Sequence, residues 1–136
     1  MNRKRGQSLV ELAVCAPIAM LLALGGAAAV RVADGHAGLD AATQAAAAAA
    51  ARSPDSFGAT RAAEQRFFSV LGGYPVHSPV LRVTLGSFNR GDEVTATSSG
   101  WVDVGWASML LMPSHVNLES KAIAHVESWR THVNGS

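Results

Sequence analysis

Glu11 is the ionisable residue whose position most needs a chemical explanation. It stands directly before the stretch 12–30, which has no charged residue, is rich in Ala and Leu and also contains Val, Ile and Met. A carboxylate beside a membrane-like run costs free energy unless something compensates it, so residues of this kind usually have a function. One alternative is that Glu11 merely reaches the lipid headgroups. The other is that it pairs with a specific cation.

Other residues that carry chemistry are scattered. Cys15 lies inside the apolar run, and the histidines have neither cysteine partners nor the HExxH spacing of a zinc site: His36, His77, His115, His125 and His132. The sequence contains no GxSxG nucleophile elbow, no P-loop and no GxGxxG turn. We therefore expect no enzyme activity, no metal site and no cofactor.

The composition favours a membrane protein over a nucleic-acid-binding protein. Hydrophobic residues make up 49% of the 136 residues and charged residues 15%. The formal net charge of +1, from 11 basic and 10 acidic residues, provides no concentrated basic field, so we expect no direct nucleic-acid site. A single cysteine excludes an intramolecular disulfide. The length suits one small folded domain beside a membrane segment.

The apolar stretch 12–30 predicts a single transmembrane helix. At about 1.5 Å per residue it would be roughly 28 Å long, close to the hydrocarbon thickness of a bilayer. Arg3, Lys4 and Arg5 precede it, whereas Arg31 alone follows closely. The positive-inside rule then predicts a cytoplasmic N-terminus, with the bulk of the chain on the outer side of the cytoplasmic membrane.

Three kinds of N-terminal segment share this pattern: a cleaved secretory signal, a plain signal anchor and a prepilin leader. Ala27, Ala28 and Ala29 could form the small-residue cleavage site of a secretory signal. Glu11 argues against that interpretation, because a signal peptide gains nothing from a carboxylate there. The alternative to a filament subunit is thus a secreted or membrane-anchored binding domain with an ordinary signal sequence.

Segment 5–11, Arg-Gly-Gln-Ser-Leu-Val-Glu, resembles the processing site of type IV pilin precursors, in which a membrane aspartic peptidase cuts after Gly and the fifth mature residue is Glu. A cut between Gly6 and Gln7 makes Glu11 the fifth residue. Pro17 falls where TadE-like minor pseudopilins usually carry a proline. Over residues 3–37 the chain is similar to the TadE-like minor pseudopilins of the Flp/Tad pilus system, which is type IVb-like.

The resemblance implies a prepilin leader over 1–6 and a minor pilin or pseudopilin subunit needed for assembly of a Flp/Tad pilus. Such filaments serve adhesion, surface attachment or DNA uptake. The implied partners are the prepilin peptidase, other pilin subunits and the inner-membrane assembly platform. The implied location is the cytoplasmic membrane, with a single pass, and then the cell-surface pilus.

Cleavage of the leader would also supply a partner for Glu11. The new α-amino group of Gln7 is substantially protonated at neutral pH. Our hypothesis is that Glu11 pairs with the Gln7 amine of a neighbouring subunit, or of its own chain, inside a low-dielectric bundle of helices. Since an unpaired carboxylate is costly there, pairing would select the axial register of the subunits.

We expect one long helix over 7–51, made of the transmembrane part and an Ala-rich extension over 34–51. Pro17 has no amide hydrogen, so the helix should bend or loosen near it, although ordinary membrane helices also tolerate proline. The alanines favour a helix and allow close helix approach. Two roles for the extension stay open: part of a filament core, or a spacer that lifts the domain off the membrane.

The remainder, 52–136, predicts an extracytoplasmic α+β domain. A second helix should begin with Ser53 as its N-cap and Pro54 at its first position, and end near Leu71. Phe57, Arg61, Glu64 and Phe68 fall at helical spacing, and Phe67, Val70 and Leu71 form an apolar edge beside them, which predicts a core face packed against a sheet.

Strand patterns follow this second helix. Apolar residues alternate with polar ones over 81–85, 94–98 and 116–126, which predicts an antiparallel sheet of about three strands. Segment 89–92 is a suitable hairpin connection, and Gly100 marks a possible bulge in the second strand. The expected fold is α+β: a long N-terminal helix, a second helix and a small pilin-like sheet.

Overall fold

The computed structural model describes residues 2–110 and 113–126. Its elements are, in order, α1 (Asn2–Arg52), α2 (Ser56–Leu71), β1 (His77–Thr84), β2 (Glu93–Asp103), the 3-10 helix η1 (Gly105–Leu110) and β3 (His115–His125). The predicted α+β class, with a long first helix, a second helix and a three-stranded antiparallel sheet, is confirmed.

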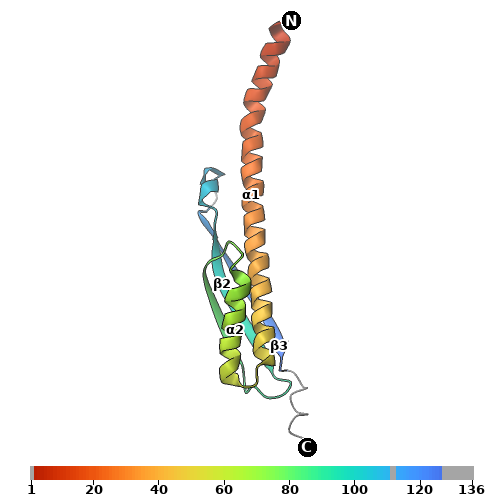
Figure 1. Ribbon diagram of the computed structural model, residues 1–136. Helices are drawn as coiled ribbons and strands as arrows, with labels where there is room; N and C mark the ends of the chain where they lie inside the picture. Colours follow the sequence, from red (N-terminus) through yellow and green to blue (C-terminus); the bar gives the residue numbers. More distant parts are fainter. Residues whose placement is uncertain (1, 111–112, 127–136) are drawn as a thin grey trace, which may run out of the picture.

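Helix α1 extends far beyond the rest of the chain, as Figure 1 shows. Its C-terminal half lies against α2 and the sheet, and its N-terminal half projects from the end where η1 lies. The helix is continuous through Pro17 and curves gently along its length. The expected interruption at Pro17 is therefore at most a bend.

The sheet is a simple meander in the order β1-β2-β3. Strands β2 and β3 pair without interruption from Glu93 with His125 to Asp103 with His115. Alternate residues of β2, such as Val94, Ala96 and Ser98, face α1 and are buried, because successive side chains of a strand point to opposite faces. One face of the sheet is thus covered by helix and the other is open.

Small residues let α1 and α2 pack closely side by side. The contact consists of residues spaced about one helical turn apart, all fully buried or nearly so: Ala42, Ala46 and Ala50 of α1, with Ala59, Ala63 and Phe67 of α2. The Ala-rich part of α1 therefore belongs to the core of the folded domain. Within this chain it acts as packing surface and not as a bare spacer.

The predicted start of α2 is wrong by two residues. Asp55, not Ser53, is the N-cap, and its carboxylate accepts a hydrogen bond from the Gly58 amide. Ser53 instead donates its hydroxyl to the Ala49 carbonyl, 3.0 Å away, at the end of α1. Because α1 and α2 follow each other closely in the sequence, Ser53 bonds to the last turn of α1 and the next residue able to cap, Asp55, begins α2.

The predicted packing of α2 against the sheet is also wrong. Phe67 is buried, but Phe57 is 82% exposed and Phe68 52% exposed. The buried face of α2 turns mainly toward α1, and its contact with the sheet is small and mostly with β1. Helical spacing alone identifies a possible face, but it cannot say which neighbour covers it.

The irregularity predicted at Gly100 lies in the opposite strand. Two residues of β1, Ser78 and Pro79, face Gly100, and Ser78 has a positive φ of 48°. Gly100 makes room for this bulge: a Cβ there would lie 2.5 Å from Val76 Cγ1 and 3.3 Å from the His77 carbonyl oxygen. The glycine thus permits a bulge in its partner strand.

Candidate functional site

The predicted cleavage segment lies in the exposed N-terminal part of α1. Arg5, Gly6, Gln7 and Glu11 are exposed, as is every residue from 5 to 23. Arg3 and Lys4 lie within the helix, but their side chains are outside the described part of the structure. A Cβ added to Gly6 would meet nothing within 4 Å. Packing within this chain therefore does not require glycine at position 6.

Glu11 and Gln7 lie one helical turn apart on the same face of α1. Helical side chains lean toward the helix N-terminus, so the Glu11 carboxylate leans toward the turn that contains Gln7. In the uncut chain no ion pair of Glu11 occurs among the described residues. A cut after Gly6 would place the new amino group about 6 Å from Glu11 Cα along the helix axis, on the N-terminal side. The Glu11 carboxylate would then be attracted by this amino group as well as by the positive end of the helix dipole.

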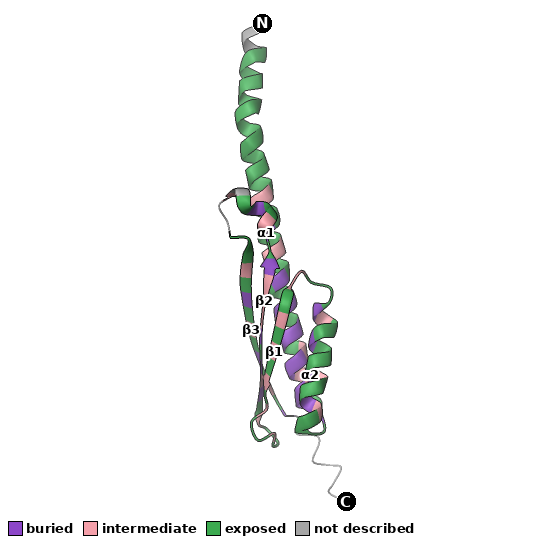
Figure 2. Cartoon of the chain, turned by 90° about the vertical axis from the view of Figure 1, so that its left-hand side faces the viewer, coloured by how far each residue is buried: buried purple, intermediate pink, exposed green. Residues whose placement is uncertain are grey.

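Apart from the charged and polar residues among its first ten, the N-terminal half of α1 is apolar on all sides. Its exposed large side chains are Leu9, Val10, Leu12, Val14, Ile18, Met20, Leu21 and Leu22. A helix that is hydrophobic all round needs an apolar environment, either a protein core or a membrane. In this chain almost none of the apolar stretch is covered by protein (Figure 2). The helix is near the N-terminus and is long and apolar enough to span a membrane.

The folded domain begins to cover α1 before the apolar run ends. Leu110 of η1 lies beside Gly25, where an added Cβ would be 3.7 Å from the leucine Cδ1, and Ala28 is fully buried. The expected span 12–30 thus overlaps with the part of α1 that contacts η1. The freely exposed part, 5–23, is itself about 28 Å long.

An open groove of about 670 Å³ runs along α1 beside β3. Its lining is mostly small and apolar and comes from one face of α1: Gly25, Ala28, Ala29, Val32, Ala33, His36, Ala37 and Asp40, with Val116 of β3. The groove continues the apolar face of the projecting half toward the domain. Its polar end is formed by His36 and Asp40.

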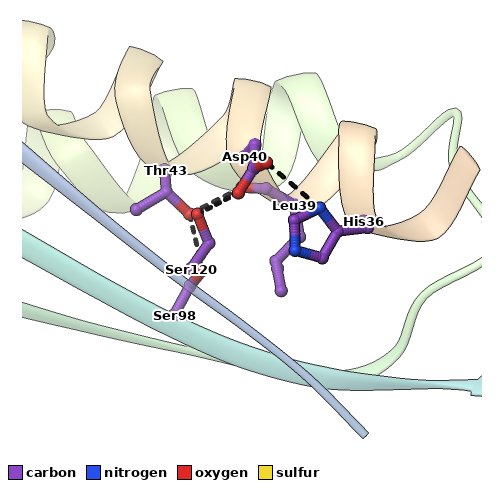
Figure 3. A network of polar contacts seen from close by, with 6 residues as sticks. All are labelled: His36, Leu39, Asp40, Thr43, Ser98 and Ser120. Carbon is purple, nitrogen blue, oxygen red and sulfur yellow. Dashed lines mark hydrogen bonds and ion pairs between the residues drawn. The ribbon is translucent and has the colours of Figure 1, made fainter. Parts of the chain in front are cut away.

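A set of polar contacts connects α1 to the middle of the sheet (Figure 3). Buried Thr43 donates its hydroxyl to the Leu39 carbonyl at 2.6 Å, and the Ser98 hydroxyl of β2 lies 2.5 Å from the Thr43 hydroxyl. Nearby, the Ser120 hydroxyl of β3 donates to Asp40, whose carboxylate also lies 3.1 Å from His36 Nδ1. Every one of these groups has a partner, so the network fixes the helix on the sheet.

The residues that set the distance between α1 and its neighbours were not among those predicted from the sequence. Gly35 and Gly38 of α1 are buried, and Cβ atoms there would lie 2.4 Å from Val102 Cγ2 and 2.2 Å from Tyr74 Cγ. Two glycines three residues apart in an otherwise Ala-rich helix were the available signal. Thr43 and Ser98 gave no signal, because their pairing depends on the tertiary contact.

The described residues contain no group of three or more His, Cys, Asp or Glu side chains that could hold a metal ion. His77 and His115 instead flank Trp101 on the open face of the sheet, with ring centroids 4.5 and 5.6 Å from the indole. His125 lies 3.8 Å from Glu93, and His132 is outside the described residues. The expectation that this protein is not an enzyme stays a prediction.

Comparisons of the chain with protein-family models, with curated proteins and with solved structures gave no match. The resemblance to TadE-like pseudopilins therefore depends on the residues of the N-terminal segment themselves, and it stays a prediction.

Proposed function

We propose that this chain is a minor pilin-like subunit, processed between Gly6 and Gln7 and held in the cytoplasmic membrane by α1 before it enters a Flp/Tad-type filament. The observation that carries the proposal is the spacing of Gly6 and Glu11 at the start of a helix whose apolar surface is uncovered within the chain up to residue 23. Both a bilayer and a bundle of like helices would cover that surface.

The position of the domain on α1 supports this proposal over an ordinary secretory signal. A cut after Ala29 would remove Ala28, which is fully buried in the core cluster, and Gly25, which contacts η1. A cut after Gly6 would remove residues 1–6, of which the two with described exposure, Arg5 and Gly6, are uncovered. The pilin-type cut therefore leaves the folded domain intact, whereas the signal-type cut opens its core.

Mass spectrometry of the protein isolated from its own cells tests the cleavage. We expect a mature chain that begins at Gln7. A start at Val30 would establish a secretory signal, and an intact start would establish a plain anchor. Either result would leave a binding domain without a filament role as the better description.

A matched pair of glycine variants tests whether a peptidase reads Gly6. A Cβ meets nothing within 4 Å at either Gly6 or Gly26, so both alanine variants should fold. We expect Gly6→Ala to slow leader removal in a pulse-chase experiment and Gly26→Ala to be processed like the parent chain. Equal processing of the two variants would contradict the proposed site.

Replacing Glu11 tests the assembly role separately from processing. We expect Glu11→Ala to be cut normally but to enter filaments poorly, because the register-selecting charge is absent. Ser8→Ala, also exposed on this part of α1, is the control and should assemble normally. Normal assembly of Glu11→Ala would contradict this role and favour the alternative, in which Glu11 only reaches the lipid headgroups.

A further inference from the structure

The 3-10 helix η1 lies beyond the end of the sheet, beside the part of α1 where the free half begins (Figure 1). Buried Val104 and Ala107 attach it to the core. Trp106 points outward and is 43% exposed, and Leu110 reaches Gly25 of α1. The described part of η1 carries no charged side chain.

A charge boundary crosses the molecule at the base of η1. Arg31 is the first charged residue of α1 after Glu11, and its Nε donates to the Asp103 carbonyl oxygen at 3.0 Å. Asp103 is the last residue of β2, and its carboxylate accepts the Gly105 amide at 2.8 Å. The charged part of α1 and the charged end of the sheet therefore stop at the same level.

η1 lies on the apolar side of this boundary. It runs beside residues 25–30 of α1. This segment, the last part of the charge-free run, is about 9 Å long. If α1 crosses a bilayer with that run, η1 sits within the outermost 5–10 Å of the apolar layer, roughly the depth of interfacial helices. Trp is enriched at this depth, since its ring is apolar and its N–H can still reach water.

We infer that η1 is a second membrane contact, with Trp106 inserted at the headgroup–acyl boundary of the outer leaflet. The occupant of this surface is lipid, because the surface is continuous with the exposed apolar face of α1. The inference depends on the anchoring part of the proposed function and not on the filament. Two contacts would fix the rotation of the domain about α1, which one helix cannot do.

Lipid-phase quenching tests the position of Trp106. The full chain is placed in phosphatidylcholine vesicles brominated at acyl carbons 6 and 7, at fewer than one copy per vesicle. The variant Trp101→Phe/Trp129→Phe keeps Trp106 as the single tryptophan. The matched control, Trp106→Phe/Trp129→Phe, keeps Trp101, which stacks on His77 on the open face of the sheet.

We expect brominated lipid to reduce Trp106 emission about twofold, as suits an interfacial ring, and to leave Trp101 emission nearly unchanged. Aqueous iodide should show the opposite preference. An environment-sensitive dye on Cys15, the only cysteine, reports on the same vesicles whether α1 is in the bilayer.

Three results would overturn the inference. If the Cys15 dye reports lipid but iodide quenches Trp106 and bromine does not, η1 is in water although the anchor stands. If Trp106 is shielded from both quenchers at fewer than one copy per vesicle, other parts of the same chain and not lipid cover η1. If neither site senses lipid, the anchor and η1 contact fail together. If the chain anchors in the membrane but does not enter filaments, the interpretation of these quenching results stays the same.

Discussion

At the scale of single residues, the Thr43–Ser98 hydroxyl pair is the most enclosed polar contact between α1 and the sheet. Thr43→Val keeps the shape of the side chain but leaves the Ser98 hydroxyl without its partner. A buried hydroxyl in that state costs about 1–3 kcal/mol. We therefore expect Thr43→Val to lower the free energy of unfolding by this amount, measured on the full chain in detergent.

The double variant Thr43→Val/Ser98→Ala provides the control, because it removes both hydroxyl groups together. We expect it to be more stable than Thr43→Val alone, with a coupling energy of at least about 0.5 kcal/mol. Strictly additive effects would show that the two hydroxyls do not depend on each other.

Asp92 makes the turn between β1 and β2 sensitive to pH. The Ser87 hydroxyl and the Asn89 amide donate hydrogen bonds to its carboxylate, and these bonds lower the pKa of Asp92 below its ordinary value. A lowered folded-state pKa means that the ionised form stabilises the fold above the unfolded pKa, near 4. This stabilisation is lost as the pH falls through the folded-state pKa.

We therefore expect Asp92→Asn to unfold at a lower temperature than the parent chain at pH 6 and at nearly the same temperature close to pH 2. The effect is small, because the carboxylate is on the surface. Melting curves from pH 2 to 7 measure it. A difference between the two chains that stays constant with pH would mean that the Asp92 charge does not stabilise the turn.

At the scale of elements, Gly38 lets the segment after α2 approach α1. A Cβ at Gly38 would lie 2.2–2.6 Å from the Cγ, Cδ1 and Cβ atoms of Tyr74, so Gly38→Ala must displace the base of the ring and not its flexible tip. The gain in helix propensity, at most about 1 kcal/mol, does not offset this overlap. We expect a net loss of about 1–3 kcal/mol in unfolding free energy.

Gly26→Ala is the matched control for Gly38→Ala. It adds the same methyl group to the same helix, where nothing lies within 4 Å. We expect Gly26→Ala to be as stable as the parent chain or slightly more stable. Equal melting temperatures for the two variants would show that Tyr74 yields easily and that Gly38 has no packing role.

The sequence predicted the elements better than the contacts between them. Alternating apolar residues identified all three strands, and β3 begins and ends within one residue of its predicted limits. The partner of α2 was predicted incorrectly, because helical spacing groups Phe57 with Phe68, which are both exposed, whereas the adjacent Phe67 is the buried aromatic residue. The alanines of α1 carried no directional signal either, since methyl groups occupy both its buried and its exposed positions.

In the candidate site too, local features could be predicted from the sequence and long-range contacts could not. Gly6, Gln7 and Glu11 are close in sequence, so their spacing could be read without a structure. The approach of η1 to Gly25 joins residues 85 positions apart, and no local pattern predicts such a contact. Its sequence signal was limited to a segment without charged residues, 104–112, that contains Trp106.

At the scale of the whole molecule, α1 serves two environments with one continuous helix. Residues 5–23 are exposed to the surrounding medium, whereas one face of the helix from Ala28 onward is part of the core of the folded domain. A chain that starts at Leu24 should therefore fold without membrane or detergent, because the removed residues whose burial is described, 5–23, are all exposed. We expect its cooperative melting temperature to lie within about 4 °C of the full chain in detergent, which corresponds to less than about 1 kcal/mol.

A chain that starts at Gly38 is the contrasting truncation. It loses Ala28, the Arg31 hydrogen bond to Asp103 and buried Gly35, against which Val102 and Leu118 pack. Uncovering these apolar side chains removes about 25 cal/mol for each Å² newly exposed, so this shorter chain should melt far below the Leu24 chain or not fold at all. Circular dichroism on both truncations, with heating and cooling, measures the difference. If the two chains melt alike, the first half of α1 is only an anchor up to Ala37, and the domain core begins later than the packing indicates.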